Sequence, residues 1–471
     1  MCCFQIERTT MDEDLAKKAE ILKNLASAEA YGGDYSAALK HGQEVLKLYE
    51  KLGDLPNLVL VHIMLARIFG EGPLLLQDQA KSLEHMEAAR PLAEPGPDTP
   101  EKAFFYTAIA HQYLHTDEPA TSVTWAKKGE DLGEKLGTLV GSPLGSAQAR
   151  LGELDKGMEY QEKDWESYLQ RSNPLGIELC GHQIILTRAL ARSIPLALKW
   201  EMIVTPQVAR IGRVSANAVN RSLVLTHTLS GEISKAMETC RIAESFDPNA
   251  AATCWLEDSA SLGFLYLRAG DWDRARQVLE KALPIHDDAH NTVAVKAFYF
   301  VLGSLSLEEG DFPKAEELLL KSLEICRNGG NVLFELWVLP VLAELCLKTG
   351  QPQKAAEYVS RGSELMKPDQ NWYGLPAPVY LGRGMLATAR KDWDTAADSF
   401  DTAIEINREY QLPWDEARTL YERGLMYLAR GGKGDRAKAH QDLDEALAIF
   451  QKVGAKKDVE KVLRKKEMLG A

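Results

Sequence analysis

Two pairs of histidines have the spacing that comes nearest to a metal site in this sequence. His286 and His290 stand four residues apart with two aspartates between them, and His111 and His115 repeat the spacing. Histidines at positions i and i+4 of one helix face can share a metal ion. The proline before the first pair and the asparagine after it predict a polar turn instead, and the second pair has no acidic third ligand nearby. We therefore expect no metal site.

The sequence also contains no residue pair that indicates a nucleophilic or acid–base catalytic site. Cys180 and His182 are close in sequence, but side chains two apart on a helix point in different directions. Asp164 and Glu166 flank a tryptophan, and such a pair is typical of a solvated helix face. The chain has no G-x-S-x-G, H-E-x-x-H or G-x-G-x-x-G motif, and residues 431–434 lack the spacing and the hydroxyl of a P-loop. The sequence therefore predicts that the protein is not an enzyme and has no catalytic residues and no cofactor.

The composition narrows the class of partner. The 471 residues carry 55 Lys and Arg against 68 Asp and Glu, a formal charge of −13, whereas a nucleic-acid surface needs a cationic surplus. The seven cysteines include no C-x-x-C pair, which favours reduced thiols in the cytoplasm. The N-terminus lacks the apolar core of a signal peptide, and charges interrupt the most apolar stretches, 58–70 and 332–347. We expect a cytoplasmic protein that binds neither nucleic acid nor membrane.

One motif recurs along the chain and organises it. Its clearest copy spans Leu262–Leu283 and contains a Leu-Gly pair, a Gly-Asp-Trp turn at 270–272 and a small residue at Ala275. Small residues recur at this last position of the motif, with steps of 39 to 43 residues. A period kept over seven steps predicts a repeat array. The column consists of Gly157, Ala197, Ala236, Ala275, Ala315, Ala355, Ala396 and Ala439.

Each copy of the motif predicts two antiparallel helices. Apolar residues at i, i+3, i+4 and i+7 form one face of the first helix. Glycine then takes the left-handed conformation that ends this helix, and the following aspartate caps the second. Small residues let the two backbones cross closely, and a bulky side chain would separate them. Since one pair cannot bury its apolar face alone, neighbouring pairs must stack into a solenoid.

This pattern resembles the tetratricopeptide repeat (TPR) family, and the match is best at Leu262–Leu283. The resemblance covers about residues 14 to 470, with a period of ~40 residues where the standard unit has 34. It is weakest near residues 56, 100 and 174, which lose the Gly-Asp turn. It implies an all-α fold, a right-handed superhelix of about eleven helix pairs with a C-terminal capping helix. We predict disorder in 1–11, the repeat array in 12–454 and the capping helix in 455–471.

A narrower resemblance follows from the long period. The last full copy, Leu412–Leu425 followed by 434–450, and the second helices that end in Leu-Gly or Val-Gly look like the C-terminal arrays of large bacterial signal-transduction ATPases. That group includes adenylate and guanylate cyclases and regulators of the maltose-activator type. The resemblance implies an arm that senses or scaffolds, while separate ATPase and output domains carry the chemistry. Their catalytic motifs do not occur in this chain, so none of their residues carries over.

The TPR resemblance also implies where a partner would bind. In TPR folds the first helix of each pair lines a concave groove, and here the corresponding positions are mainly apolar and aromatic. Such a groove suits an amphipathic helix or an apolar peptide with aromatic anchors. The alternative is that a tight superhelix buries the same residues against the next helix. The candidate groove residues are Arg221, Leu225, Phe264, Phe300, Trp337, Glu344 and Met385.

We therefore expect a non-enzymatic scaffold whose groove binds a protein or peptide segment. Its leading role is the sensor or regulatory arm of a bacterial signal-transduction system, with an ATPase or cyclase on another chain as a candidate partner. The alternative is a self-standing adaptor that assembles a multiprotein complex. The Lys, Asn and Arg clamp of co-chaperone TPR domains does not recur, with Arg221 the only candidate. The aromatic segment Asn371–Pro376 is either an exposed anchor or a plug between repeats.

Overall fold

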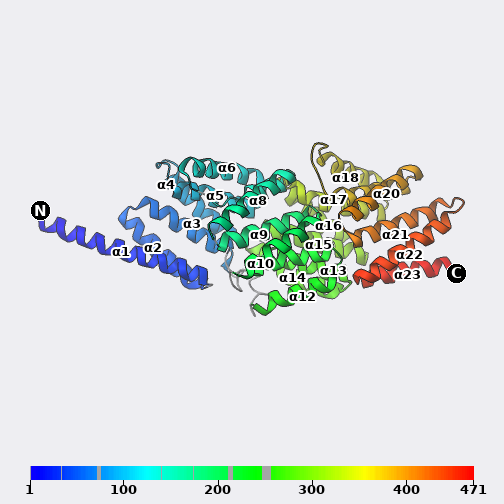
Figure 1. Cartoon of the computed structure of the whole chain (residues 1–471), viewed down its shortest axis with the longest axis horizontal. Helices are drawn as coiled ribbons and strands as arrows, with labels where there is room; N and C mark the ends of the chain where they lie inside the picture. Colours follow the sequence, from blue (N-terminus) through cyan, green and yellow to red (C-terminus); the bar gives the residue numbers. More distant parts are fainter. Residues whose placement is uncertain are drawn as a thin grey trace. The chain divides into compact units, whose positions relative to one another are not determined.

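The computed structural model describes the backbone of residues 2–32, 34–71, 76–138, 140–172, 174–210, 216–246 and 256–470. Within these ranges the chain forms 23 helices and no strand (Figure 1). It divides into two compact units: unit 1 holds residues up to Leu144 with the segment Ile285–Thr292, and unit 2 holds most of Gly145–Ala471. The predicted all-α fold of stacked helix pairs is confirmed.

Unit 1 begins the array with pairs of neighbouring helices. The pairs are α1 with α2, α3 with α4, and α5 with α6. The backbone of residues 2–11 belongs to α1, where the sequence predicts disorder, and the side chains of these residues lie outside the description. The helices are α1 (Cys2–Gly32), α2 (Tyr35–Leu52), α3 (Leu55–Glu71), α4 (Gln79–Ala93), α5 (Pro100–His115) and α6 (Pro119–Leu136).

Unit 2 continues the pairs and ends on a single helix, α23, which packs against α22 through buried Val462. Its first helices are α7 (Leu144–Arg150), α8 (Leu154–Gln170), α9 (Pro174–Leu190), α10 (Ile194–Ala209), α11 (Ala216–Leu229), α12 (Ile233–Phe246), α13 (Leu256–Ala269), α14 (Trp272–Asp288) and α15 (Thr292–Glu309). The later ones are α16 (Phe312–Gly329), α17 (Val332–Lys348), α18 (Pro352–Leu365), α19 (Pro376–Ala389), α20 (Trp393–Glu409), α21 (Pro413–Arg430), α22 (Asp435–Val453) and α23 (Lys456–Gly470).

The turn inside the repeats forms as the Gly-Asp motif predicts. Gly310 has a φ of 86°, the left-handed conformation that glycine adopts without a Cβ clash. Asp311 then caps α16, because its Oδ1 accepts a hydrogen bond of 3.2 Å from the backbone N–H of Lys314. The small-residue column is confirmed as an interior feature of the second helices. All of its alanines are fully buried: Ala197, Ala236, Ala275, Ala315, Ala355, Ala396 and Ala439.

Glycines of the first helices mark where the two helices of a pair cross. A Cβ added to Gly263 would lie 2.5 Å from Cδ2 of Leu279, and one added to Gly303 would lie 2.8 Å from Cγ of Leu319. In each pair this leucine stands four residues after the column alanine. The glycine therefore faces a leucine one turn along the second helix, not the alanine that the motif suggests.

Repeats that lack the turn glycine keep its backbone conformation. Asp117 has a φ of 61° between α5 and α6, Arg192 a φ of 58° between α9 and α10, and Lys391 a φ of 60° between α19 and α20. A residue with a Cβ occupies this region at a cost of about 1 kcal/mol or more. The stacking of neighbouring repeats, rather than local preference, therefore sets these three turns.

The segment Asn371–Pro376 plugs a junction instead of standing exposed. Trp372 is buried, its Nε1 donates to the carbonyl oxygen of Lys367 at 2.9 Å, and a Cβ on Gly152 would lie 2.8 Å from its ring. Tyr373 donates from Oη to Oδ1 of Asp155 at 2.5 Å. These contacts join the α18–α19 connection to the α7–α8 turn, whose residues lie 218 positions earlier in the chain.

Two more turns of unit 2 pack against its C-terminal helices. A Cβ on Gly231, between α11 and α12, would lie 2.6 Å from Val453 at the end of α22. A Cβ on Gly270, between α13 and α14, would lie 2.8 Å from the backbone nitrogen of Lys457 in α23. The early turns of unit 2 thus contact its last repeats directly.

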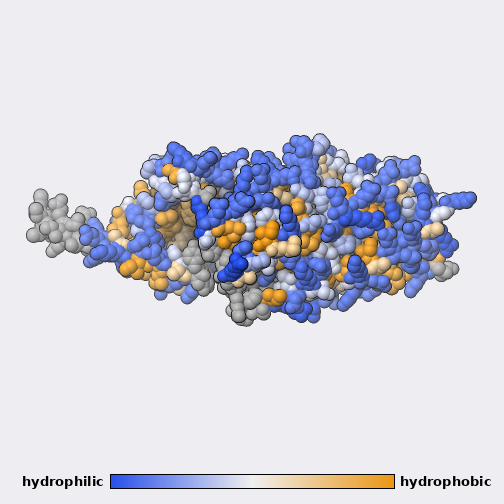
Figure 2. All heavy atoms as spheres, in the orientation of Figure 1, coloured by the Kyte–Doolittle hydropathy of each residue, from blue (hydrophilic) through white to orange (hydrophobic). Residues whose placement is uncertain are grey.

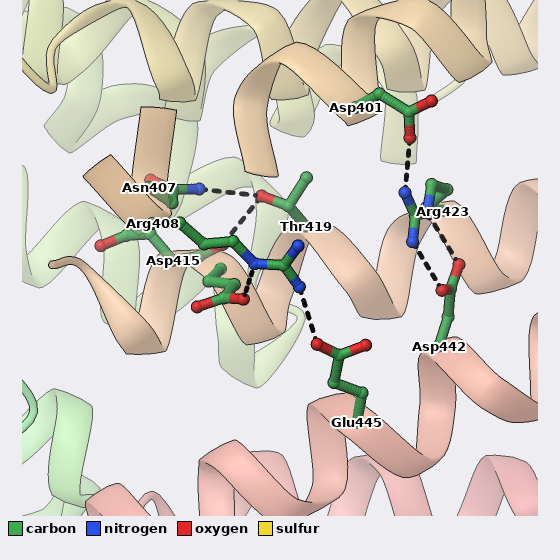
Figure 3. Close-up of polar contacts among 9 residues, drawn as sticks. Asp401, Asn407, Arg408, Asp415, Thr419, Arg423, Asp442 and Glu445 are labelled. Atoms are coloured by element: carbon green, nitrogen blue, oxygen red, sulfur yellow. Dashed lines mark hydrogen bonds and ion pairs between the residues drawn. The ribbon is translucent and has the colours of Figure 1, made fainter. Parts of the chain in front are cut away.

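Charged side chains tie three of the last helices together (Figure 3). Arg423 of α21 donates from Nε and Nη2 to both oxygens of Asp442 in α22, at 2.9 and 2.7 Å, and from Nη1 to Asp401 in α20. Arg408 of α20 reaches Glu445 of α22 at 2.7 Å. Asp442 is buried, so its pairing with Arg423 is the contact most shielded from solvent.

The surface is mostly hydrophilic on the face that Figure 2 draws, with hydrophobic residues in scattered patches. In the part of the chain that the structure describes, none of the helices combines the length and the apolar character that a membrane span requires.

Candidate functional site

Six of the seven predicted groove residues line two adjoining pockets in unit 2. Phe264 of α13, Phe300 of α15 and Trp337 of α17 contribute to both pockets. Leu225 lines only the first pocket, whereas Glu344 and Met385 line only the second. Arg221 of α11 lines neither of them. The first helices of successive repeats therefore bring most of the predicted residues to one place.

A cluster of aromatic rings separates the two pockets. The Trp337 ring lies 6.0 Å from Phe264 and 6.0 Å from Phe300, each in an edge-to-face arrangement, and stacks on Phe334 at 6.4 Å. The indole Nε1 donates a hydrogen bond of 2.8 Å to the carbonyl oxygen of Leu190. Aromatic pairs in these geometries are favourable beyond their buried area. The hydrogen bond fixes the orientation of the indole between the pockets.

The first pocket, which we call the apolar pocket, has a volume of about 70 Å³. Beside the aromatic cluster, its lining includes Leu186 and Leu190 from α9, Leu225 from α11 and Ala297 from α15. A space walled mainly by carbon favours an apolar group over ordered water, because water there lacks hydrogen-bond partners. The pocket is suited to the apolar side chain of a bound segment.

The second pocket, which we call the arginine pocket, has a volume of about 50 Å³ and a different chemistry. Five charged side chains contribute to its lining: Arg192 from the α9–α10 turn, Arg268 from α13, Glu344 from α17, and Asp415 and Arg418 from α21. Elements far apart in sequence thus supply three cations and two carboxylates to one small space.

Glu344 and Arg418 form one ion pair at this pocket. Arg418 donates from Nη2 to Oε2 of Glu344, and Nζ of Lys348 lies 3.1 Å from Oε1. Burial alone would raise the pKa of Glu344, but Arg418 and Lys348 outweigh it and lower the pKa to about 2. Glu344 is therefore a paired carboxylate within the wall and not a free acceptor for a partner.

Asp415 pairs with two arginines at once. Nη2 of Arg192 lies 2.5 Å from its Oδ2, and Nη2 of Arg268 lies 3.5 Å from its Oδ1. Burial would raise the pKa of Asp415, but the two guanidinium groups hold it below its usual value. Burial lowers the pKa of Arg268 to about 10, so that side chain also stays charged at neutral pH.

The aromatic groove residues are both buried and next to a pocket. Phe264, Phe300 and Trp337 are 5%, 6% and 7% exposed. The sequence allowed two interpretations, an accessible apolar groove or burial against the next helix. These residues combine low exposure with a position in the wall of a pocket, so the structure has a feature of each interpretation. That these residues bind a partner stays a prediction.

Motif reasoning missed the charged members of the arginine pocket. Arg192 occupies the turn position that is glycine in most repeats, so a comparison of the turn column could have singled it out. Arg268 follows Phe264 by one helical turn but is not among the predicted groove residues. Asp415 and Arg418 come from α21, which contributes none of the predicted groove residues. Their proximity depends on the contacts between early and late repeats.

The residues with candidate chemistry lie in structural positions. Cys180 of α9 is buried, its Sγ donates to the carbonyl oxygen of Gln161, and burial raises the pKa of the thiol well above its usual value. His286 is a buried residue of α14, which continues through Pro284 to Asp288, so the predicted turn begins only at Ala289 and His290, where His290 has a φ of 54°. Within the described ranges, no group of three or more His, Cys, Asp or Glu side chains is arranged to hold a metal ion.

Comparison with known protein families identifies part of the array. Residues 260–281 and residues 293–367 match models of the tetratricopeptide repeat. These segments are therefore tetratricopeptide repeats, as the motif predicts. The narrower likeness to the arrays of bacterial signal-transduction ATPases stays a prediction. No curated protein matches the sequence significantly.

Several solved structures align with most of this chain. The APC/C hetero-tetramer Cut9–Hcn1 is 15% identical, with 96% of this chain and 98% of that chain covered and a TM-score of 0.36. A Rap protein complexed with competence and sporulation factor is 12% identical, with 84% and 99% covered and a TM-score of 0.48. A monomeric mutant of IFIT1 with Gppp-AAAA is 16% identical, with 88% and 94% covered and a TM-score of 0.45.

Proposed function

We propose that this array of tetratricopeptide repeats is a non-enzymatic interaction scaffold whose unit 2 binds a segment of a partner protein. The apolar pocket is the observation that carries the proposal, because the first helices of successive repeats converge there with an aromatic cluster at its edge. Burying an apolar side chain contributes about 25 cal/mol per Å² of apolar surface removed from water. Aromatic anchors commonly dominate the affinity of such interfaces.

The finer role that we propose is the sensor or regulatory arm of a bacterial signal-transduction system in the cytoplasm. It rests on the resemblance of the long-period repeats, above all Leu412–Leu425, to the arrays of signalling ATPases and cyclases. A bound segment would change the array only if it binds one curvature better than another. The alternative, a self-standing adaptor of a multiprotein complex, fits the same pockets. An ATPase or cyclase among the bound partners would favour the signalling role.

A substitution that tests the binding site should leave the buried aromatic cluster unchanged. Replacing three buried aromatic residues by alanine would cost about 3–5 kcal/mol each, which approaches the whole stability of a typical domain. Ala297 is a better position, because it lines the apolar pocket, is partly exposed and can be enlarged without removing core contacts. Ala297→Phe should occupy the pocket from within, and Ala448→Phe on the exposed face of α22 is the matched control.

The assay is capture of partners from native lysate by the purified chain, with each candidate then titrated as a purified protein. We expect a direct partner to lose binding to Ala297→Phe and to keep it with Ala448→Phe, while both variants retain the wild-type helical content. Hydrogen exchange should show protection of α13, α15 and α17 on binding. Full binding of every partner by a folded Ala297→Phe variant would contradict the proposal.

A further inference from the structure

Arg192 holds a backbone conformation that favours glycine. Its φ is 58°, and a residue with a Cβ rarely persists there unless its surroundings demand it. Strain of this kind is a reason to ask what the side chain does. The equivalent turns of other repeats in unit 2 carry glycine at positive φ: Gly152, Gly231, Gly270, Gly310 and Gly350.

The Arg192 side chain runs into the arginine pocket. It is 5% exposed, its guanidinium lies 5.0 Å from the centre of the Trp337 ring, and its Nη2 reaches Asp415. Glycine would remove the strain of the turn and lose all three features. The arginine therefore contributes a buried positive charge beside the aromatic cluster that a glycine turn would lack.

Arg268 brings a second guanidinium to the same carboxylate. It stacks 4.8 Å from the centre of the Phe264 ring and 3.2 Å from that of Trp414, and it shares Asp415 with Arg192. Among the described residues, no group accepts a hydrogen bond from the buried Nε of Arg192 or the buried Nη1 of Arg268. Buried donors without acceptors are unfavourable, so the pair has capacity for a second anion.

The remaining charges do not neutralise this pair. Glu344 is already paired with Arg418 and Lys348. Asp458 accepts a hydrogen bond of 2.9 Å from Nε1 of Trp414, and it acts on Arg268 less strongly than Asp415 does. Glu308 and Glu422 act on Arg418, whereas Arg192 and Arg268 share the single adjacent carboxylate of Asp415.

We propose that the arginine pocket binds one carboxylate group of the segment that occupies unit 2, between Arg192 and Arg268, while an adjacent apolar side chain enters the apolar pocket across Trp337. This inference rests on the proposed function and specifies its ligand. A carboxylate suits the forked donors of guanidinium. Asp415 and Glu344 in the wall disfavour the greater charge of a phosphate. The carboxylate comes from an acidic side chain or from a chain terminus.

Short acetylated peptides can test the site in the full-length chain. The probes are N-acetyl-phenylalanine with a terminal carboxylate, N-acetyl-Phe-Asp-amide with a side-chain carboxylate, and N-acetyl-phenylalaninamide with none. We expect at least one carboxylate probe to bind about tenfold or more tightly than the amide, because a charge-assisted hydrogen bond contributes at least that factor. Whichever carboxylate probe binds more tightly identifies the source of the carboxylate.

Arg192→Gly is the decisive variant. It introduces the residue of the equivalent turns and leaves Asp415 facing Arg268, so it should fold. It should abolish the preference for the carboxylate while leaving the amide unaffected. Lys391→Gly makes the same change in an exposed turn and should keep the preference. Equal binding of carboxylate and amide in the millimolar range, no binding of either, or an unchanged preference in a folded Arg192→Gly variant would overturn the proposal. Competition by inorganic phosphate as strong as that by the carboxylate would also overturn it.

The outcomes separate this inference from the proposed function. Two results together would support both the anion site and the proposed function. Arg192→Gly would lose the carboxylate preference, and Ala297→Phe would block binding of the whole partner protein. Partner binding that Ala297→Phe blocks, without any carboxylate preference, would refute the anion site alone. A carboxylate preference with no effect of Ala297→Phe on any partner would support the anion site and contradict the scaffold's binding pocket.

Discussion

Replacing Arg423 by methionine should destabilise the end of unit 2 more than the loss of an ordinary ion pair. Methionine keeps much of the aliphatic stem but removes both hydrogen bonds to Asp442, whose side chain is 5% exposed. A buried carboxylate without its partner costs about 3–5 kcal/mol. The third bond of Arg423 goes to Asp401, which is 53% exposed, and pairs of that kind contribute about 0–1 kcal/mol.

These values give three variants with different expected results. Arg423→Met should lower the free energy of unfolding by about 3–5 kcal/mol, and Asp401→Ala by about 1 kcal/mol or less. The double variant Arg423→Met/Asp442→Leu should recover most of the loss, because no charge is left buried without a partner. Replacing a whole buried pair by apolar residues is often close to neutral.

Hydrogen exchange measured by mass spectrometry suits this test, since repeat proteins open locally as well as globally. Exchange in α21 and α22 should accelerate by about two to four orders of magnitude in Arg423→Met, because about 1.4 kcal/mol corresponds to a factor of ten. Equal effects of Arg423→Met and Asp401→Ala, or a double variant as unstable as Arg423→Met, would refute the assignment of the energy to the stranded Asp442 carboxylate.

Four other substitutions test the packing and the buried groups. Gly303→Ala should lower the free energy of unfolding by about 1–3 kcal/mol, because its Cβ meets Leu319. Gly424→Ala, whose nearest atoms lie 3.4 Å from the added Cβ, should be neutral or stabilise by up to about 1 kcal/mol. Urea unfolding measures both variants, and equal effects would contradict the crossing geometry. Burial lowers the pKa of His62 from 6.5 to about 4 and also lowers that of its neighbour His85, so the unfolded chain binds more protons between these values. Unit 1 should therefore lose stability as the pH falls from about 6.5 toward 4, and melting curves of His62→Leu should depend less on pH over that range. Tyr373→Phe removes a hydrogen bond to a carboxylate and should lower the melting temperature of unit 2 by an amount equivalent to about 1–2 kcal/mol; an unchanged melting temperature would mean that this plug is not held by that bond.

The repeat architecture was readable from the sequence because its determinants are local. Gly310 and Asp311 specify a turn and a cap within a few residues, and the alanine column follows directly from the period. Where the turn glycine is missing, as at Asp117 and Arg192, local preference opposes the observed conformation. Those turns could not be predicted from their own residues, since the stacked neighbours impose them.

The candidate site was predictable only in part for the same reason. Phe264, Phe300 and Trp337 lie on first helices of successive repeats, 36 and 37 residues apart, which is about one helical turn short of the period. The i, i+3, i+4 spacing of a helix face therefore placed them on one side. The pairing of Arg192 and Arg268 with Asp415 joins residues that the period keeps apart. Such contacts depend on how far the helix stack rotates per repeat, which no short motif encodes.

The contacts of the early turns with the last repeats also constrain how this protein can evolve. In an open solenoid, a duplication or deletion of one repeat leaves every other neighbour in place. Here Gly152 meets Trp372, Gly231 meets Val453 and Gly270 meets Lys457. Losing one repeat between them would shift all three matches at once. The number of repeats in unit 2 is therefore a fixed property of its fold, and homologues should vary in loop length before they vary in repeat count.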